Sequence, residues 1–130
     1  MILLDTHIVA WLAFDSAQLS AKAREAIDAA RNSGEGLAIS DITLLELATL
    51  TSKGRLHLAL SLESFLREVE ARFIVLPISG HACVRALDLP ARYPRDPADR
   101  IIGATALVEG LSLVTADRKI RHSRALRTIW

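Results

Sequence analysis

The sequence predicts an α/β fold built on a central parallel sheet of four to five strands. Short apolar runs at residues 2–4, 37–39, 73–76 and 111–114 alternate with longer segments whose apolar residues recur every three to four positions. The 130 residues contain no internal repeat, low-complexity tract or linker, and 51% of them are hydrophobic, which is enough for one core. We therefore expect a single domain over residues 1–130.

The first half of the chain is expected to form two strands and three helices. Residues 2–4 make the first strand, and a helix through residues 8–12 follows it. Ser20 is suited to cap a second helix, which ends before two glycines and the strand at 37–39. Ser40 or Asp41 caps a third helix that runs to residue 53, just ahead of a glycine.

The second half continues the alternation. A helix through residues 62–69 precedes the strand at 73–76, whose β-branched and aromatic residues give the clearest strand pattern in the chain. Ser79 starts another helix, and a loop containing prolines leads into a helix that ends near Gly110. The strand at 111–114 and a short last strand at 128–130 complete the expected sheet.

Composition narrows the class of protein. The single cysteine, Cys83, excludes an internal disulfide framework and suits a reducing compartment. No apolar run approaches the roughly 20 residues of a membrane span, and the N-terminal residues lack the basic segment of a signal peptide. We expect a cytoplasmic protein with no membrane partner.

Charge is unevenly distributed along the chain. Residues 1–91 hold eight basic and eleven acidic side chains, whereas residues 92–130 hold eight basic and four acidic ones. A basic stripe of this kind can bind polyanions such as nucleic acid, and it can equally be a solvated surface.

Acidic residues follow three of the predicted strands. Asp5 directly follows the first strand, Asp117 follows the strand at 111–114, and Glu46 lies in the helix that starts after the strand at 37–39. Ligands of open parallel sheets bind beyond the carboxyl ends of the strands, so these acids are directed to one edge. Each also has a plainer explanation, since Asp5 and Asp117 can be helix N-caps and Glu46 can sit on the exposed edge of its helix.

The segment R-D-P-A-D-R (95–100) adds two more acids. Asp96 before Pro97 is a strong helix start, with an acid at the N-cap and proline in the first turn. Asp99 is then at the third helical position, where a carboxylate is stabilised by the positive helix end. If Asp99 meets Asp5, Glu46 and Asp117, four carboxylates repel one another unless a divalent cation such as Mg²⁺ or Mn²⁺ binds between them.

Other site chemistries fit less well. The four histidines show no zinc-ligand spacing, and neither Ser40 nor Cys83 lies in a nucleophile motif. A phosphoacceptor domain would need adjacent acids after the first strand and a lysine after the last, and a D-x-D phosphatase would need an acid where His7 stands.

Four motifs in order resemble the PIN domain, and most closely the VapC-type toxins of toxin–antitoxin pairs. They are L-L-D-T-H (3–7), S-D-I-T-L-L-E-L (40–47), D-P-A-D-R-I-I-G-A-T-A (96–106) and L-V-T-A-D (113–117). The resemblance covers essentially the whole chain and implies a three-layer fold with a parallel sheet between helices. It implies a metal-dependent endoribonuclease that is held inactive by an antitoxin, and a homodimer.

Carried over position by position, the resemblance assigns roles to individual residues. The catalytic and metal-binding acids would be Asp5, Glu46, Asp99 and Asp117, with Mg²⁺ or Mn²⁺ activating a water for attack on an RNA phosphodiester. Small hydroxyl residues flank the site, and four basic residues are candidates for RNA phosphate contacts. The flanking residues are Thr6, Ser40 and Thr115, and the basic ones are Arg100, Arg118, Lys119 and Arg121.

Two questions stay open at this level. The rival function is a non-catalytic PIN-like module that holds RNA or protein without metal. Trp11 and Phe14, with the apolar helix at 44–50, can form a groove for the antitoxin or can simply be core. Asp96 recurs in the resembling subgroup, and its capping geometry favours a structural role.

Overall fold

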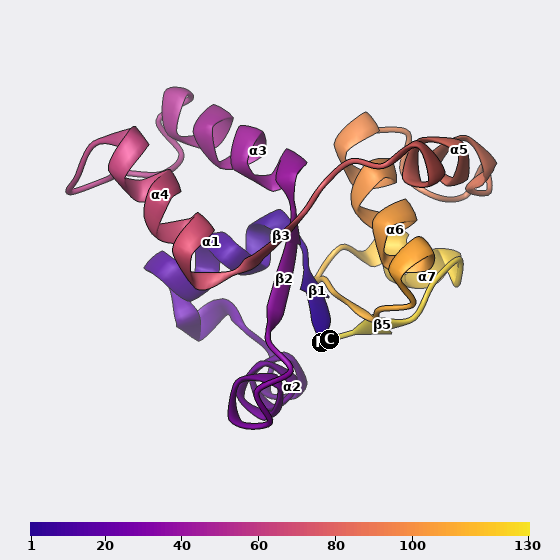
Figure 1. Cartoon of the computed structure of the whole chain (residues 1–130), viewed down its shortest axis with the longest axis horizontal. Helices are drawn as coiled ribbons and strands as arrows, with labels where there is room; N and C mark the ends of the chain where they lie inside the picture. Colours follow the sequence, from indigo (N-terminus) through magenta and orange to yellow (C-terminus); the bar gives the residue numbers. More distant parts are fainter.

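The computed structural model describes residues 1–130 and contains one five-stranded sheet, in which every pair of neighbours is parallel. The spatial order is β3-β2-β1-β4-β5, so the first strand of the chain is the central one (Figure 1). The strands are β1 (Ile2–Leu4), β2 (Leu37–Ser40), β3 (Ile74–Leu76), β4 (Leu113–Val114) and β5 (Thr128–Ile129). The predicted fold class and all five predicted strands are confirmed.

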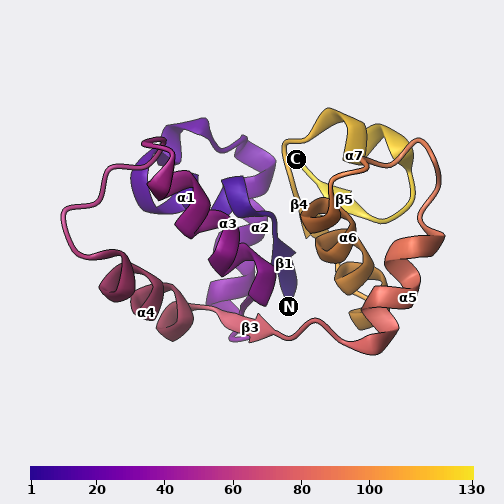
Figure 2. The same ribbon diagram turned by 90° about the horizontal axis from the view of Figure 1, so that it is seen from above.

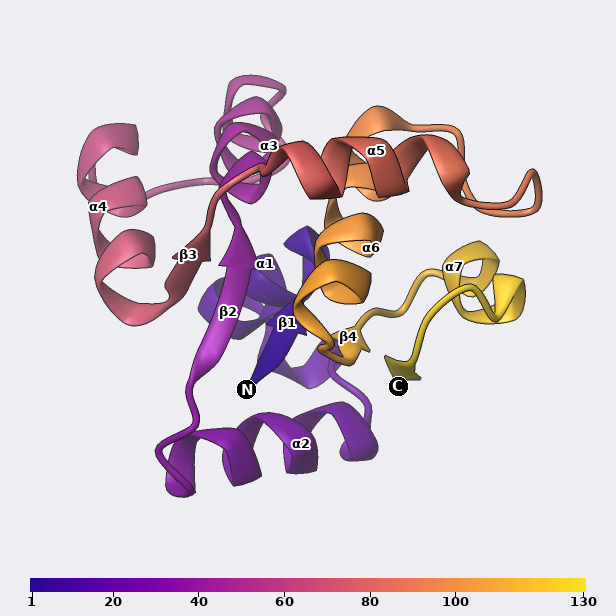
Figure 3. The same ribbon diagram turned by 45° about the vertical axis from the view of Figure 1, so that its right-hand side comes forward.

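Seven α-helices surround the sheet. Helices α1–α4 lie on one side of β1 and helices α5–α7 lie on the other side, in both of two perpendicular views (Figures 1 and 2). Figure 3 shows α2 beneath the end of the sheet where the strands begin, and α5 at the opposite end. The helices are α1 (Thr6–Phe14), α2 (Ala21–Asn32), α3 (Asp41–Ser52), α4 (Leu62–Arg72), α5 (Gly80–Asp88), α6 (Pro97–Glu109) and α7 (Arg118–Ser123), with a 3₁₀ turn η1 (Ser16–Gln18).

The central strands bury both of their faces. Alternate side chains of a strand point to opposite faces, so Leu4 joins the core beneath α1–α4 while Leu3 joins the core beneath α6 and α7. The same split separates Val114 from Leu113 on β4. Strands that are covered on both sides have continuous apolar sequences, which is why short apolar runs marked them.

The clearest strand pattern belongs to an edge strand. β3 pairs only with β2, and Ile74 is 41% exposed. Phe73, which was expected to open this strand, is the residue that ends α4. A high β-propensity therefore marked the strand correctly but did not indicate its depth in the fold.

The predicted helix caps are confirmed by hydrogen bonds. The Ser20 and Ser79 hydroxyls accept from the backbone N–H groups three residues on, each at 3.0 Å. Of the two candidates at α3, Ser40 is the N-cap, and its hydroxyl accepts from the N–H of Ile42. Gly110 ends α6 in the left-handed conformation that glycine adopts without strain.

A buried tyrosine fixes the start of α6. Tyr93 is fully buried in the loop before α6, and its hydroxyl donates a 2.9 Å hydrogen bond to the backbone carbonyl of Asp99. The ring passes so close to Gly103 that a Cβ atom there would lie 2.7 Å from Cζ of the ring, closer than real side chains approach. Gly103 thus lets Tyr93 hold the turn that carries Asp99.

No helix in the structure is both long and apolar enough to cross a lipid bilayer.

Candidate active site

An acidic cavity of about 400 Å³ opens at the carboxyl ends of β1 and β4. Five carboxylates line it, and they come from four separated segments of the chain. Its lining residues are Asp5, His7, Trp11, Glu46, Asp96, Asp99, Ala116 and Asp117. The four acids that were expected to meet therefore share one cavity.

Asp5 is the most buried of these acids, at 7% exposure. One of its oxygens accepts a 2.9 Å hydrogen bond from the N–H of Thr6 and so caps α1. The other accepts a 2.7 Å hydrogen bond from the Thr115 hydroxyl at the end of β4. The capping explanation is correct for Asp5, and the second hydrogen bond ties its carboxylate to the neighbouring strand.

Glu46 reaches the cavity from α3. The Thr6 hydroxyl donates to its Oε1 at 2.5 Å, and a second threonine, Thr43, lies 3.2 Å from the Thr6 oxygen on the preceding turn of α3. Glu46 is half-buried, so it is not simply a residue on the exposed edge of its helix. Thr6 thus positions the carboxylate of a different helix.

Asp96 and Asp99 stand at the start of α6. The Asp96 carboxylate accepts a 3.2 Å hydrogen bond from the N–H of Asp99, which confirms the predicted cap with Pro97 in the first turn. Asp96 also lines the acidic cavity, a position that the capping argument did not indicate. No side-chain hydrogen bond of the structure ends on the Asp99 carboxyl, which leaves both of its oxygens available to a ligand.

Asp117, like Asp96, is exposed. It caps α7 by accepting a 2.9 Å hydrogen bond from the N–H of Ile120, as the N-cap explanation required. Its own N–H donates to the Thr115 hydroxyl at 3.1 Å, so Thr115 connects Asp5 with Asp117. Asp117 can cap a helix and line the cavity at once, because α7 begins at the carboxyl end of β4, where the cavity opens.

The cavity holds these carboxyls in an unfavourable electrostatic state. Burial, together with the repulsion of the neighbouring carboxylates of Asp5 and Asp96, raises the pKa of Asp99 to about 7. Burial also raises the pKa of Asp5, against the lowering effect of its Thr115 and Thr6 hydrogen bonds, and the pKa of Glu46. Negative charge is therefore concentrated where the protein offers little to neutralise it.

The donor set suits a hard divalent cation that keeps much of its water. Carboxylate oxygens are the preferred ligands of Mg²⁺ and Mn²⁺, and Mg²⁺ is commonly bound through one or two carboxylates plus waters. No three His, Cys, Asp or Glu side chains converge as a ready ligand cage, so the acids fit a hydrated ion better than a fully enclosed one. A bound cation would also remove the mutual repulsion that raises the pKa of Asp99.

Comparison with known proteins places the chain in a family. The model of the PIN domain matches residues 2–125. The chain belongs to the PIN-domain family. Its resemblance to VapC-type proteins is also confirmed, since it is 37% identical to Ribonuclease VapC22 of Mycobacterium tuberculosis over 131 residues, covering 99% of this chain and 98% of that protein.

Solved structures agree with the PIN fold. A DNA-bound VapBC from Salmonella typhimurium has a TM-score of 0.68 at 25% identity, covering 98% of this chain and 97% of the other. A toxin–antitoxin complex from Klebsiella pneumoniae has a TM-score of 0.61 at 26% identity, covering 90% of this chain and 87% of the other.

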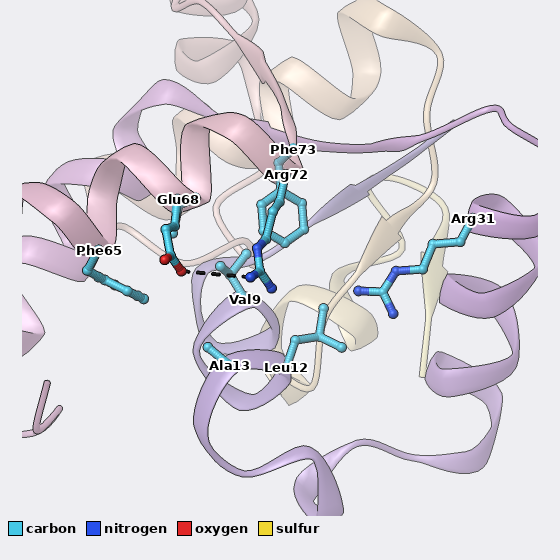
Figure 4. A pocket seen from close by; sticks show the side chains of 9 residues that line it. Val9, Leu12, Ala13, Arg31, Phe65, Glu68, Arg72 and Phe73 are labelled. Carbon is cyan, nitrogen blue, oxygen red and sulfur yellow. Dashed lines mark ion pairs between the residues drawn. The ribbon is translucent and has the colours of Figure 1, made fainter. Parts of the chain in front are cut away.

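A second, apolar cavity of about 400 Å³ lies on the α1–α4 side of this PIN domain. Figure 4 shows Val9, Leu12 and Ala13 of α1 beneath the side chains of α4, with Arg31 reaching in from α2. Arg72 pairs with Glu68 across one turn of α4, at 3.8 Å. An apolar floor with charged rims is typical of a surface that accepts an amphipathic segment.

Trp11 and Phe14 form neither a simple core nor a simple surface. The ring of Trp11 packs at a tilt against that of Trp130, with 5.9 Å between the ring centroids, and Trp11 also lines the acidic cavity. Phe14 is 44% exposed, and its ring centroid lies 5.4 Å from that of Phe65. Both also line a smaller cavity with Leu50, at the end of the apolar helix that sequence reasoning paired with them.

Two predicted site residues make their hydrogen bonds away from the acids. Arg100 was expected to contact RNA, but its guanidinium is turned into the protein, where Nη1 donates to the carbonyls of Ala86 and Leu89 at 3.0 and 3.3 Å. It anchors the end of α5 to α6. Ser40 is fully buried and caps α3, with no hydrogen bond to any of the acids.

The other basic candidates lie where RNA could reach them. Arg118 and Lys119 are exposed on α7 directly after Asp117, and Arg121 is half-buried one turn further on. None of the three forms an ion pair.

Sequence reasoning did not name Thr43 as a neighbour of the acids, and it left His7 as either a structural residue or a neighbour of the site. His7 stands two residues after Asp5 and follows it into the cavity, while Thr43 shares a helix face with Glu46 at a spacing of three.

Proposed function

We propose that this chain is a divalent-metal-dependent endoribonuclease and the toxin of a toxin–antitoxin pair. The observation that carries the proposal is the cavity that Asp5, Glu46, Asp99 and Asp117 line, in a PIN domain whose whole-length relative is named a ribonuclease. Mg²⁺ or Mn²⁺ bound there would supply a Lewis acid beside the scissile phosphate and lower the pKa of a water.

The residues of the chain would divide the work around that ion. Asp5 and Asp99 are the proposed ligands, because Asp5 is fixed by two hydrogen bonds and both Asp99 oxygens are free. Glu46, held by Thr6, and Asp117, held in place at the start of α7, would orient the attacking water and complete the ligand set. The Thr115 hydroxyl would keep the Asp5 carboxylate turned toward the cavity.

The test is cleavage of a structured RNA by the wild type and by Asp99→Asn, with Asp28→Asn on the exposed face of α2 as the matched control. We expect Mg²⁺- or Mn²⁺-dependent cleavage by the wild type and the control, and a loss of at least about 100-fold in Asp99→Asn. Equal rates for the wild type and Asp99→Asn, or cleavage that persists in EDTA, would refute the metal mechanism.

The same experiment separates the rival function. A non-catalytic PIN-like module would bind the RNA with the same affinity with and without metal and would cleave nothing. The set of five carboxylates disfavours that rival, because a site that only binds RNA has no use for charges that repel phosphate.

We propose that the cognate antitoxin covers the apolar cavity between α1, α2 and α4 with an amphipathic segment. Related VapBC and toxin–antitoxin complexes support a partner of this kind. The floor formed by Val9 and Leu12 and the exposed ring of Phe14 on the same helix support the site. Titration with the purified antitoxin should give at least about tenfold weaker binding for Leu12→Asp than for the wild type, and equal binding would exclude this surface.

The homodimer that the family resemblance implies stays a proposal. Its support is an exposed apolar strip on α5, where Val84 is 62% and Leu87 is 85% exposed, with Leu45 of α3 62% exposed. The wild type should sediment as a dimer, and Leu87→Asp should shift the mass toward the monomer. An unchanged dimer mass would assign the dimer to another face, and a monomeric wild type would refute the dimer.

A further inference from the structure

Two adjoining cavities lie at the opposite end of α6 from the acids. One, of about 420 Å³, is bounded by the C-terminal end of α6 and the segment before β5. The other, of about 340 Å³, is bounded by the end of α5 and the loop after it. They share Leu107, Arg124 and Ala125, so they form one continuous surface, which we call the arginine groove.

Four arginines line the arginine groove against one carboxylate. They are Arg85, Arg92, Arg124 and Arg127, all exposed, and Asp88 is the single acid. The structure contains two ion pairs, one from the N-terminal ammonium and one from Arg72 on α4, so none of the groove arginines is neutralised by a carboxylate. Unpaired positive charge over an apolar floor attracts polyanions.

Two of the groove arginines are held in place by backbone carbonyls. The Nε–H of Arg92 donates to the carbonyl of Ser123 at 2.6 Å, and Nη2 of Arg127 donates to the carbonyl of Gly110 at 2.8 Å. Each guanidinium keeps further N–H groups for a ligand, and its planar fork matches the oxygens of a phosphate. Ordering these side chains in advance lowers the entropy lost when a ligand binds.

Arg124 occupies a conformation that glycine normally takes. Its φ of 54° is left-handed, and every other residue with positive φ in the chain is a glycine. Non-glycine residues held in this conformation cluster at active sites and ligand-binding sites. The position puts the Arg124 side chain in both cavities of the groove.

We propose that the arginine groove binds the phosphate backbone of RNA whose scissile phosphate lies in the acidic cavity. The inference rests on the proposed ribonuclease function. Helix α6 connects the two sites, since Asp99 stands at its start and Gly110 at its end (Figure 3). Eleven residues at about 1.5 Å each separate them by roughly 16 Å, which about five nucleotides of a helical strand can span. RNA that extends beyond the acidic cavity is therefore held by both sites, whereas a very short RNA reaches only one.

The binding test uses a labelled RNA hairpin of about 30 nucleotides and protein carrying Asp99→Asn, so that no RNA is cleaved. In this background Arg124→Gly, Arg127→Ala and the double variant are compared with Lys22→Ala, an exposed basic residue on α2. Each lost phosphate contact should lower the slope of log affinity against log salt by about 0.7 to 0.9. We expect affinity at moderate salt to fall several-fold per arginine, with no change for Lys22→Ala.

Stability provides an independent readout. Glycine relieves the left-handed strain at position 124, so Arg124→Gly should melt at the same or a higher temperature than its parent while binding RNA more weakly. That combination would support the inference, because unfolding cannot explain it. An unchanged RNA affinity and salt slope would overturn the inference. If duplex DNA of the same length is titrated in parallel, a loss of affinity for that DNA alone would also overturn it.

Cleavage separates this inference from the proposed function. With Asp99 intact, the double variant should cleave a tetranucleotide at the wild-type rate and the hairpin with a several-fold lower kcat/KM. If the wild type cleaves neither RNA, the ribonuclease proposal fails, and the hairpin binding test alone decides whether the groove binds RNA. If it cleaves both and the variant matches it on both, the groove is not part of the RNA site.

Discussion

Asp99 should destabilise the metal-free protein at neutral pH, so that Asp99→Asn makes it more stable. The pKa of Asp99 is about 7 in the folded protein against an ordinary value of 3.8, because burial and then the neighbouring carboxylates disfavour its charge. Below about pH 4 the carboxyl is protonated in both the folded and the unfolded chain, and it costs nothing. As pH rises toward 7 the unfolded chain releases this proton first, so the stability of the folded state falls.

The magnitude follows from the size of the shift. Three pKa units at about 1.4 kcal/mol each give an upper value of about 4 kcal/mol. Water and salt in the open cavity screen part of the repulsion, and the start of α6 attracts the charged form by about 0.5 kcal/mol, so we expect about 2 kcal/mol at pH 8. For a chain of this length that corresponds to roughly 6 to 10 °C in Tm.

The assay is thermal unfolding in EDTA at several pH values between about 4 and 8. The Tm of Asp99→Asn minus that of the wild type should be near zero at the acid end and should grow to its full value at the alkaline end. Asp28→Asn, an exposed acid on α2, should show no such growth. A difference that is constant with pH, or a variant less stable than the wild type at pH 8, would refute this account of the cavity. Mg²⁺ or Mn²⁺ should raise the Tm of the wild type more than that of Asp99→Asn, because the ion binds the charged carboxyl.

Variants at three further positions, Gly103, Arg100 and Asp96, test the elements around the site. Gly103→Ala forces a methyl group against the buried Tyr93 ring and should lower the free energy of unfolding by about 2 kcal/mol in urea, whereas Gly80→Ala, with open space around it in a helix, should leave that free energy unchanged or raise it. Arg100→Ala should lower the free energy of unfolding by about 2 kcal/mol, because two hydrogen bonds to the end of α5 are lost. The slope of log RNA affinity against log salt should not change, and a lower slope would show that Arg100 contacts an RNA phosphate. Asp96→Ala removes the α6 cap, at about 1 kcal/mol, while Asp96→Asn keeps a capping oxygen; if both variants cleave RNA equally once folded, the role of Asp96 is to start the helix.

Strands and helices were predictable where one local rule decided them. The apolar runs at β1, β2 and β4 are buried on both faces, and the serine and aspartate caps place the helix starts to within a residue. The exposed edge position of β3 was not predictable, because the order of strands depends on how the helices pack and not on the residues of the strand itself.

That the acids line one cavity was predictable from the parallel topology, but their surroundings were not. Asp5 and Asp117 follow neighbouring strands, so any parallel arrangement brings them to one edge. The inward turn of Arg100 depends on the carbonyls at the end of α5, which lie eleven and fourteen residues away and have no sequence signal. The capping hydrogen bond accounts for an aspartate at position 96, so the sequence pattern contains no separate signal that Asp96 also lines the cavity.

The order of the strands has a consequence during protein synthesis. Asp5 leaves the ribosome early, but the hydroxyl that holds its carboxylate belongs to Thr115, 110 residues later, and β4 must insert beside β1 before the two meet. Chains are made from the N-terminus at about 5 to 20 residues per second and long-range contacts form last. A growing chain therefore lacks a complete acidic cavity until β4 and Thr115 emerge, and before that point the proposed nuclease has no finished site with which to cleave the message from which it is being translated.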